Sequence, residues 1–398
     1  MKKINKNITK ILLEYNKFLE KFEIFQKTNK EFPNTYGYNL ISNDISRLQK
    51  SIKKTKPGSK FEALILKQIS RGLQACQARG DFQFNYKNFS IDDFCKVLFG
   101  NDSLKNLELY LRNMDYKQLW KYYSLETQYS YNRLHELNDN IYCNLKEEFK
   151  KIKPMIIDWG FKQKLIPSGF NITVDLIQYN VGSNYNPGLQ MINIDINFVL
   201  VFLKKNKISY NWILILPTIF HEYFGHALNG FYSREMPGCF NADFKPGVQF
   251  FNKPVSEGIA NAASRLALDF VKEYKKELKV TNKDLDYLNN LLNSQLSFYT
   301  LKAYFEYLKI KKVFEADLNI KKEIIQITEN PGLIFNFNQN QTPDFSNFLY
   351  YFSLFSGSLK VQSIINKTSN KNTYLKTFFK LLQFNSNLDI LEEMLKIL

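Results

Sequence analysis

The sequence predicts an α+β protein that is mostly helical and contains a small antiparallel or mixed sheet. Apolar residues recur every three to four positions through residues 1–150 and again from about 211 to 398, which is typical of amphipathic helices. Alternation with a period of two, which is typical of strands, is confined to two short segments between them. The chain has 398 residues, of which 44% are hydrophobic, so it can bury a sizeable core.

Residues 1–150 are expected to form a helical N-terminal region. Apolar side chains from Ile11 to Phe22 recur at three- and four-residue spacing, which places them on one face of a helix. A polar loop at 53–60 leads into a second predicted helix over 61–80. That helix should end at Gly80, because glycine commonly terminates helices.

Residues 90–100 carry the signals of a short capped helix. Ser90 is a preferred N-cap residue, two acidic residues follow in the first turn, and Gly100 stands where the helix should stop. One or two further helices are expected between about 104 and 150. Residues 151–398 then form the second predicted region.

Two short strands are predicted near the start of this second region. Residues 172–176 alternate apolar and polar side chains, and residues 192–198 do the same. The turn-rich sequence YNVGSNYNPG lies between them. From about residue 211 the spacing is helical again, with a loop expected at 329–344.

Two of the three histidines of the chain lie in one motif, PTIFHEYFGHALNG at 217–230. His221 and His226 are candidate metal ligands, and Glu222 is a candidate general base. Zinc peptidases with an HExxH helix place the histidines four residues apart, so that both imidazoles point the same way. The spacing here is five residues, which puts the second imidazole about 140° from the first on a regular α-helix.

One extra residue within the helix would bring the two imidazoles back together. A π-type bulge accommodates such a residue, and these bulges are frequent at functional sites. Gly225, directly before His226, is expected to supply the backbone freedom that the bulge needs. Pro217 suits the first turn of this helix, and Gly230 suits its end.

A third ligand is needed, because a catalytic zinc ion usually has three protein ligands. Glu257 is the best candidate, since it lies at the start of the helical run SEGIANAASRLALDF. Glu235 and Asp243 are the competing oxygen ligands. His135 is also followed by a glutamate, but no second histidine follows at metal spacing, so we expect a structural or surface role for it.

Polar positions on the same helix are candidates for orienting the metal ligands. Helical periodicity places Asn261, Ser264 and Arg265 on the same side as Glu257, in a run that is otherwise rich in Ala, Ile and Leu. Outer residues of this kind commonly hold ligands in place. We expect Asn261 to have this role.

The two segments together resemble a known group of metallopeptidases. HEYFGHALNG followed by SEGIAN is similar to the HExxxH gluzincins, and among them to the microtubule-associated tyrosine carboxypeptidases and their bacterial relatives. That family has an E-G-L-A-type segment about thirty residues after the HExxxH helix, and thirty residues separate His226 from Glu257 here. The resemblance covers about residues 170–270. One glutamate precedes Gly258 where the family commonly has two, so the substrate is not carried over.

The resemblance implies a zincin-like catalytic domain within residues 151–398, with the small sheet beside the metal-binding helix. It implies Zn²⁺ as the cofactor, His221, His226 and Glu257 as its ligands, and Glu222 as the general base. The implied activity is that of a zinc metallopeptidase acting on a peptide or protein. A carboxypeptidase that acts on acidic protein tails is one form of that activity.

Further residues are candidates because of the chemistry of such a reaction. The oxyanion needs a donor beside the metal, for which the candidates are Tyr185, Tyr210, Tyr223 and Tyr232. A carboxypeptidase needs a cation for the terminal carboxylate, and the arginines nearest to the ligands in sequence are Arg234 and Arg265. The strand over 190–198 could act as an edge strand that pairs with extended substrate.

The formal net charge of +16 favours acidic partners. The lysines are spread along the chain and no zinc-finger or RRM signature is present, so no specific nucleic-acid partner is expected. No apolar run is long enough to span a bilayer and the N-terminus lacks a secretory signal. We therefore expect a cytoplasmic protein, with signal-independent export left open. The four cysteines form no CxxC pair and are expected to be free thiols.

Three other functions remain open. The first is a non-catalytic binding or effector protein, metal-stabilised or metal-free, that uses its basic surface. The second is nucleic-acid binding, which steeply salt-dependent DNA binding would reveal. The third is a hydrolase with the same metal site that cleaves an amide outside proteins.

Overall fold

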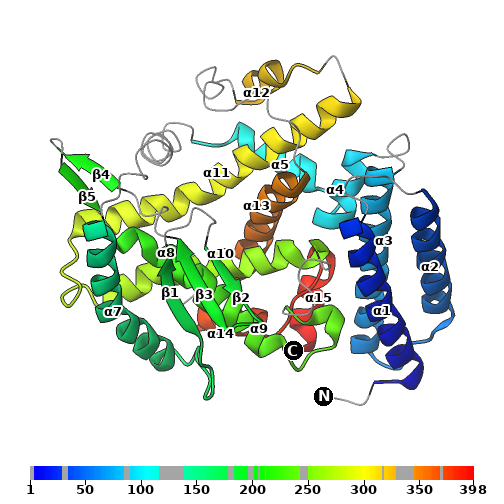
Figure 1. The fold of residues 1–398 in the computed structure, drawn as a ribbon, viewed down its shortest axis with the longest axis horizontal. Coiled ribbons are helices and arrows are strands. Elements are labelled where there is room, and N and C mark those ends of the chain that lie inside the picture. The colour runs from blue at the N-terminus through cyan, green and yellow to red at the C-terminus, as the bar shows by residue number, and fades with distance from the viewer. Residues whose placement is uncertain are drawn as a thin grey trace.

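Helices form most of the described chain, and a small mixed sheet accompanies them (Figure 1), so the predicted fold class is confirmed at that level. The computed structural model describes residues 4–28, 35–84, 90–115, 139–177, 183–195, 201–204, 207–210, 212–242, 250–315, 318–328, 345–367 and 371–398. The predicted loop at 329–344 and His135 lie outside these residues.

The N-terminal part consists, where it is described, of α1 (Lys6–Thr28), α2 (Thr35–Lys54), α3 (Lys60–Phe84), α4 (Ile91–Phe99) and α5 (Ser103–Arg112). Ser90 caps α4 as predicted, because its Oγ accepts a hydrogen bond from the Asp93 N–H at 3.2 Å. Gly100 follows α4 with a φ of +94°, a conformation that favours glycine. Both predicted ends of this helix are therefore confirmed.

The helix predicted over 61–80 continues past Gly80, because α3 ends at Phe84. Gly80 is buried against α2, where an added Cβ would lie 2.9 Å from Cε2 of Tyr38. The glycine therefore permits close packing between two helices and does not end one. The predicted end at Gly80 is wrong for this reason.

The N-terminal helices share packing contacts with the rest of the chain. α7 (Asp139–Lys162) contains residue 150, where the boundary between the two regions is predicted. Buried apolar side chains from both regions belong to one hydrophobic cluster. Phe94 of α4, for example, lies 5.1 Å between ring centroids from Phe345, the first residue of α13 (Phe345–Ile365).

The first sheet has the strand order β1-β3-β2. β1 (Thr173–Ile177) runs parallel to β3 (Met191–Asp195), and β2 (Asn184–Asn186) runs antiparallel to β3. The two predicted strands are confirmed where they are described, while residues 196–198 lie outside that part. β2 lies in the segment that was predicted to contain only turns. It was not predicted because three residues are too few to show the alternation of a strand.

β3 is the central strand of this sheet, because β1 and β2 flank it on both sides. The prediction that residues 190–198 form an edge strand is therefore wrong. β2 lies at one edge of this sheet and contacts the helix of the histidine motif.

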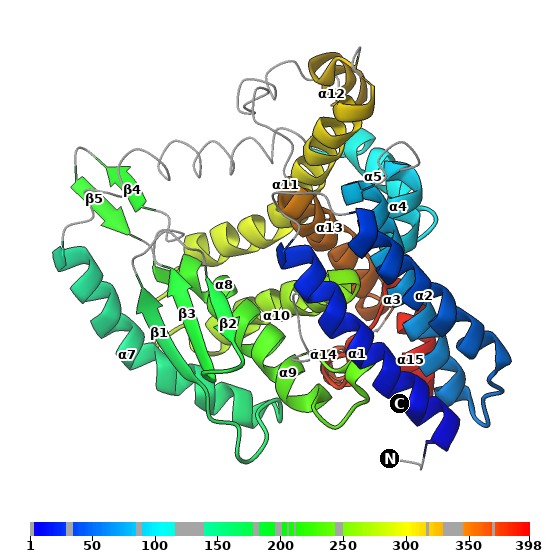
Figure 2. The same cartoon turned by 45° about the vertical axis from the view of Figure 1, so that its right-hand side comes forward.

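A second pair of strands was not predicted. β4 (Val201–Lys204) and β5 (Lys207–Tyr210) form an antiparallel hairpin, which lies beside one end of α7 in both views (Figures 1 and 2). Each strand has only four residues, so its alternation is too brief to stand out from the basic sequence around it.

The remaining elements are helical: η4 (Trp212–Ile215), α8 (Leu216–Phe220), η5 (His221–Ala227), α9 (Leu228–Ser233), η6 (Gly238–Phe240), η7 (Phe250–Asn252), α10 (Lys253–Glu273), α11 (Asn282–Phe314), α12 (Ile320–Thr328), α13, α14 (Lys371–Leu382), η9 (Leu388–Ile390) and α15 (Leu391–Ile397). Figures 1 and 2 show the first sheet and α7 on one side of the molecule and α1–α3 on the other. α10 and α13 lie between them.

Within the described residues, no helix combines the length and the apolar character that a membrane crossing requires.

Candidate metal centre

The helix of the histidine motif changes its hydrogen-bonding pattern at the motif itself. α8 is a regular helix, η5 is π-helical from His221 to Ala227, and α9 is regular again. The Leu228 N–H donates to the carbonyl of Tyr223, five residues earlier, as a π-helix requires. The predicted π-type distortion is therefore confirmed, and it includes both histidines.

The two predicted ends of this helix have different outcomes. Pro217 lies in the first turn of α8, as predicted. Gly230 lies buried inside α9, which continues to Ser233, so the prediction that Gly230 ends the helix is wrong.

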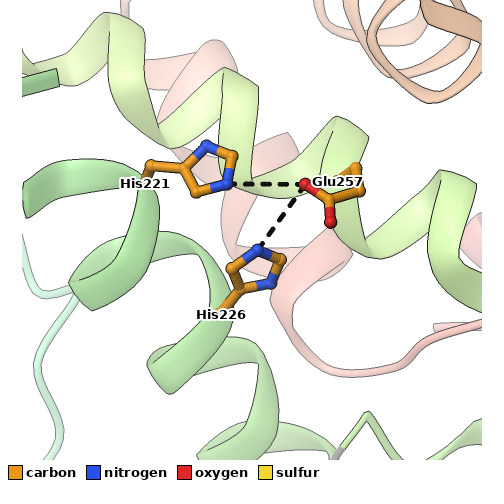
Figure 3. Close-up of side chains that lie close together, drawn as sticks. All are labelled: His221, His226 and Glu257. Atoms are coloured by element: carbon orange, nitrogen blue, oxygen red, sulfur yellow. Dashed lines mark ion pairs between the residues drawn. The ribbon is translucent and has the colours of Figure 1, made fainter. Parts of the chain in front are cut away.

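Glu257 reaches both histidines from a different helix, α10. Figure 3 shows its carboxylate pointing towards the two imidazoles. Glu257 Oε2 lies 3.5 Å from His221 Nε2 and 3.7 Å from His226 Nε2. These distances are longer than an N–H···O hydrogen bond of about 2.7–3.2 Å. The ligand atoms of the three side chains all lie within 4.8 Å of one another, so the group can hold a metal ion.

Two carboxylate oxygens at this site are buried without a hydrogen-bond partner in the described part of the chain. They are Oε2 of Glu257 and Oε2 of Glu222, and both residues are 6% exposed. A buried charged oxygen without a partner is costly, so such atoms usually face a cation or an ordered water. A cation between the imidazoles would satisfy Glu257 Oε2, and the donor set therefore fits a metal ion.

The electrostatics of the site favour a positive charge between the three side chains. Burial disfavours an ionised Glu257, but interactions with His221 and His226 outweigh this and hold the pKa of Glu257 well below its usual range. Burial also disfavours a charged His226, yet the Glu257 carboxylate raises the pKa of His226 above its ordinary value, and Glu222 adds to this. A proton or a metal ion could supply that positive charge.

Ser256 is a residue at the site to which the sequence predicted no role. Its Oγ lies 3.1 Å from Nδ1 of His226. If Nδ1–H donates to this hydroxyl, Nε2 keeps the lone pair that faces Glu257, as a metal ligand requires. The only sequence signal is the position of Ser256 directly before Glu257. That signal becomes informative only once the packing of α10 against η5 is known.

Close contacts between helices set the position of α10. A Cβ on Gly225 would lie 2.5 Å from the Cα of Ala260, so η5 and α10 approach closely at this point. Gly258 of α10 in turn faces the backbone of Gly357 on α13. Gly225 is not one of the glycines with a positive φ, so the predicted need for backbone freedom is wrong. Close packing of η5 against α10 explains this glycine.

The predicted polar residues of α10 make hydrogen bonds to other partners. Asn261 Nδ2 donates to Ser358 Oγ of α13 at 2.7 Å. Arg265 Nη1 donates to the Asn293 side-chain oxygen of α11 at 3.3 Å, and Ser264 Oγ donates to a carbonyl within α10. These bonds join α10 to its neighbours, and the roles predicted for Asn261 and Arg265 at the metal site stay predictions.

The candidates for substrate contacts on and near η5 also have other partners. The Tyr232 hydroxyl donates to the Leu165 carbonyl at 2.8 Å, and burial raises the pKa of Tyr232 to about 12. The guanidinium of Arg234, an exposed residue, lies 5.3 Å from the centroid of the Phe231 ring. Their predicted contacts with a substrate stay predictions.

The other candidates differ in their surroundings. Tyr223 is 4% exposed, and burial raises its pKa to about 12, which is typical of a packed side chain. Tyr185 lies in β2, beside η5. Glu235 is exposed and is not part of the three-residue group. Asp243 and the side chain of Tyr210 lie outside the described residues.

Comparisons of the chain with models of protein families, with curated proteins and with solved structures find no match. The geometry of the site is therefore the basis for a functional proposal.

Proposed function

We propose that the chain is a zinc-dependent metallopeptidase whose metal ligands are His221, His226 and Glu257 and whose general base is Glu222. One observation carries this proposal. Nε2 of both histidines and Oε2 of Glu257 converge from two helices, at 3.5 and 3.7 Å, although the histidines are five residues apart. A helix with satisfied core histidines has no need of this π-helical distortion, so the convergence favours a metal site.

The spacing of the ligand atoms supports zinc. Two ligands about 2.1 Å from a tetrahedral zinc ion are about 3.4 Å apart. The distances of 3.5 and 3.7 Å are close to this value. Two imidazole nitrogens and one carboxylate oxygen also form a donor set found in catalytic zinc sites, where the fourth position is left for water. Bound zinc supplies a Lewis acid that makes water reactive near neutral pH.

Glu222 supports the catalytic part of the proposal. It follows the first ligand directly in η5, it is buried, and its Oε2 has no hydrogen-bond partner in the described residues. Its carboxylate charge also contributes to the raised pKa of His226. In the proposed reaction Glu222 accepts a proton from the attacking water and passes it to the leaving amine.

The class of substrate is a peptide or protein, with acidic sequences favoured. The resemblance of HEYFGHALNG and SEGIAN to the tyrosine carboxypeptidase family supports peptide hydrolysis. The net charge of +16 supports the capture of acidic chains. A carboxypeptidase that trims acidic tails combines these two properties.

Substitution of Glu222 by Gln tests the proposal. The variant should bind one zinc ion per chain, as measured by mass spectrometry of the metal content, because none of the three ligands changes. Its kcat on a library of peptides should fall by a factor on the order of 10² to 10⁴, which is the usual contribution of a general base. Glu235→Gln, which removes an exposed carboxylate nearby in sequence, is the matched control and should keep the activity.

Two results would contradict the proposal. Full hydrolysis by Glu222→Gln would exclude Glu222 as the base. A zinc-loaded wild-type chain that cleaves no peptide would instead favour the non-catalytic binding protein.

A further inference from the structure

A lysine lies one helical turn before the third metal ligand. Lys253 is the first residue of α10, and Glu257 is four residues later. Side chains at this spacing share one face of a helix, with Cβ atoms about 5–6 Å apart. The Lys253 charge contributes to the lowered pKa of Glu257 and opposes the raised pKa of His226, in agreement with this placement. Lys253 is half-buried and forms no ion pair with a carboxylate in the described residues.

A tyrosine from another helix meets this lysine. The Lys253 Nζ lies 4.7 Å from the centroid of the Tyr350 ring, within the range of a cation–π contact. Tyr350 lies on α13, two turns before Gly357, and therefore on the same face of α13 as that glycine. Gly357 packs against the backbone of Pro254 on α10. The close packing of α10 and α13 therefore brings Tyr350 beside Lys253.

The hydroxyl of Tyr350 can act as a hydrogen-bond donor towards solvent or a ligand. Tyr350 is 40% exposed. The surrounding side chains partly desolvate the phenol, and the carboxylates of Glu257 and Glu222 add to this, so its pKa is raised well above its ordinary value. The phenol therefore keeps its proton at neutral pH. The contact of its ring with Lys253, one helical turn from Glu257, places it near the same site.

We propose that Lys253 and Tyr350 form a subsite that binds a carboxylate of the substrate beside the metal centre. An ammonium group without a carboxylate partner and a neighbouring hydroxyl donor offer two donors, and a carboxylate offers two acceptor oxygens. This assignment rests on the proposed function, since it concerns the substrate of that site. Arg265 lies on α10 as well, but Lys253 is closer in sequence to Glu257, at four residues instead of eight.

The carboxylate has two possible sources, the C-terminus of a peptide or an acidic side chain. Three N-acetylated hexapeptides separate them. The first contains one glutamate and ends in a free carboxylate, the second has the same sequence with an amidated C-terminus, and the third has the free C-terminus with glutamine in place of the glutamate. Loss of affinity in the second peptide assigns the subsite to the terminal carboxylate, and loss in the third assigns it to the side chain.

Binding is measured by calorimetry with the full zinc-loaded chain carrying Glu222→Gln, in which the proposed function predicts that cleavage is slow. We expect one of the two carboxylates to improve affinity by a factor on the order of ten, because a charge-assisted hydrogen bond has about this strength. Lys253→Met should abolish that preference, Tyr350→Phe should reduce it, and Lys253→Arg should retain it. Lys272→Met is the control, since it removes the same charge from α10 about 28 Å away.

Equal affinities of the three peptides for the Glu222→Gln chain would overturn the inference. Two results with Lys253→Met would also overturn it: an equal loss of affinity for all three peptides, or an unchanged preference for one carboxylate. In either case the lysine would only balance the charges of Glu257 and Glu222. Zinc content is measured for every variant. If the wild-type chain cleaved no peptide, only the proposed function would be contradicted, because the binding measurement does not depend on hydrolysis.

Discussion

His226 has to be neutral before its Nε2 can bind a metal ion. Burial lowers the pKa of this imidazole, but the Glu257 carboxylate more than reverses that effect, so the pKa is raised. An ordinary histidine has a pKa of about 6.5. Protons therefore compete with the metal at His226 from a higher pH than usual. Glu257 has a lowered pKa and stays ionised, so it adds no competition near neutral pH.

We expect zinc affinity to be highest above the raised pKa of His226 and to fall as the pH decreases through it. The sign follows because the apo protein binds a proton that the zinc form must release. Titration against a chromogenic chelator from about pH 8 to pH 5.5 measures this dependence. A zinc affinity that stays constant down to about pH 6 would show that no histidine with a raised pKa takes part in binding.

Ser256 should influence zinc affinity without contacting the ion. Ser256→Ala removes the partner of His226 Nδ1, so the ring loses its preferred tautomer and orientation. We expect zinc affinity to fall by a factor of about 10 to 100, with the fold retained. Ser264→Ala is a matched control on the same helix, since its hydroxyl bonds a carbonyl within α10. Equal effects of the two substitutions would contradict a specific role for Ser256.

The three residues that could hold a metal ion were predicted from the sequence, whereas the residues around them were not. His221, Glu222 and His226 belong to one motif, and thirty residues separate His226 from Glu257, a spacing that indicated Glu257 as the third member of the group. Ser256 and Lys253 meet the site only because α10 packs against η5. Tyr350 is 93 residues after Glu257 in the sequence and lies near the site through the contact of α13 with α10. Such contacts depend on tertiary packing, which leaves no local pattern.

At the scale of helices, the π-helix and the glycine contacts together bring the ligands into register. η5 turns the two histidines to one side, and the contact of Gly225 with Ala260 sets the distance from η5 to α10. The distances of 3.5 and 3.7 Å depend on that approach. A substitution at this contact should therefore shift Glu257, although none of the three site residues is replaced.

Gly225→Ala should weaken zinc binding and destabilise the fold. The new Cβ would lie 2.5 Å from the Cα of Ala260, so α10 has to move away from η5. We expect the free energy of unfolding to fall by about 1–3 kcal/mol, which is typical of overpacking, and the zinc affinity to fall with it. Urea unfolding and chelator competition measure the two quantities. Gly188→Ala is the control, because a Cβ there would meet only a side-chain oxygen at 3.4 Å.

If Gly225→Ala kept both stability and zinc affinity at the level of the control, the contact between the two helices would not determine the geometry of the site.

Sequence patterns predicted some features of these helices and not others. The five-residue spacing predicted the π-helix correctly, because only such a distortion aligns the histidines. Glycine was less informative, since Gly80 and Gly230 lie within helices and one of them serves close packing.

At the scale of the whole molecule, the N-terminal helices support the start of α10. Gln68 of α3 is fully buried, and its Nε2 donates to Asn252 Oδ1 at 2.6 Å and to the Cys239 carbonyl at 3.1 Å. Its Oε1 accepts from the Asn387 N–H at 3.0 Å. Asn252 directly precedes Lys253, so this network joins the N-terminal part to the helix that carries Glu257.

Gln68→Ala should therefore destabilise the whole chain. It leaves buried polar groups without partners, which typically costs about 1–3 kcal/mol in the free energy of unfolding. Guanidinium unfolding measures the change, and Gln74→Ala, on the less buried side of α3, is the control. A loss confined to the N-terminal helices, with the C-terminal part unaffected, would contradict a shared core.

The fold class was predictable because long helical periods and two short alternating segments leave few other arrangements. The joining of the two regions was not predictable. Contacts such as Phe94 with Phe345, or Gln68 with Asn252, connect residues that are far apart in the sequence. Hydrophobic spacing shows which side chains are buried, but it does not show against which helix.

Anomalous diffraction at the zinc edge, from crystals of the full chain grown with zinc, tests the metal centre most directly. One strong peak should lie between His221 Nε2, His226 Nε2 and Glu257 Oε2, about 2.0–2.2 Å from each atom. A zinc ion bound elsewhere, or none at this position at full zinc saturation, would contradict the metal site and the peptidase built on it.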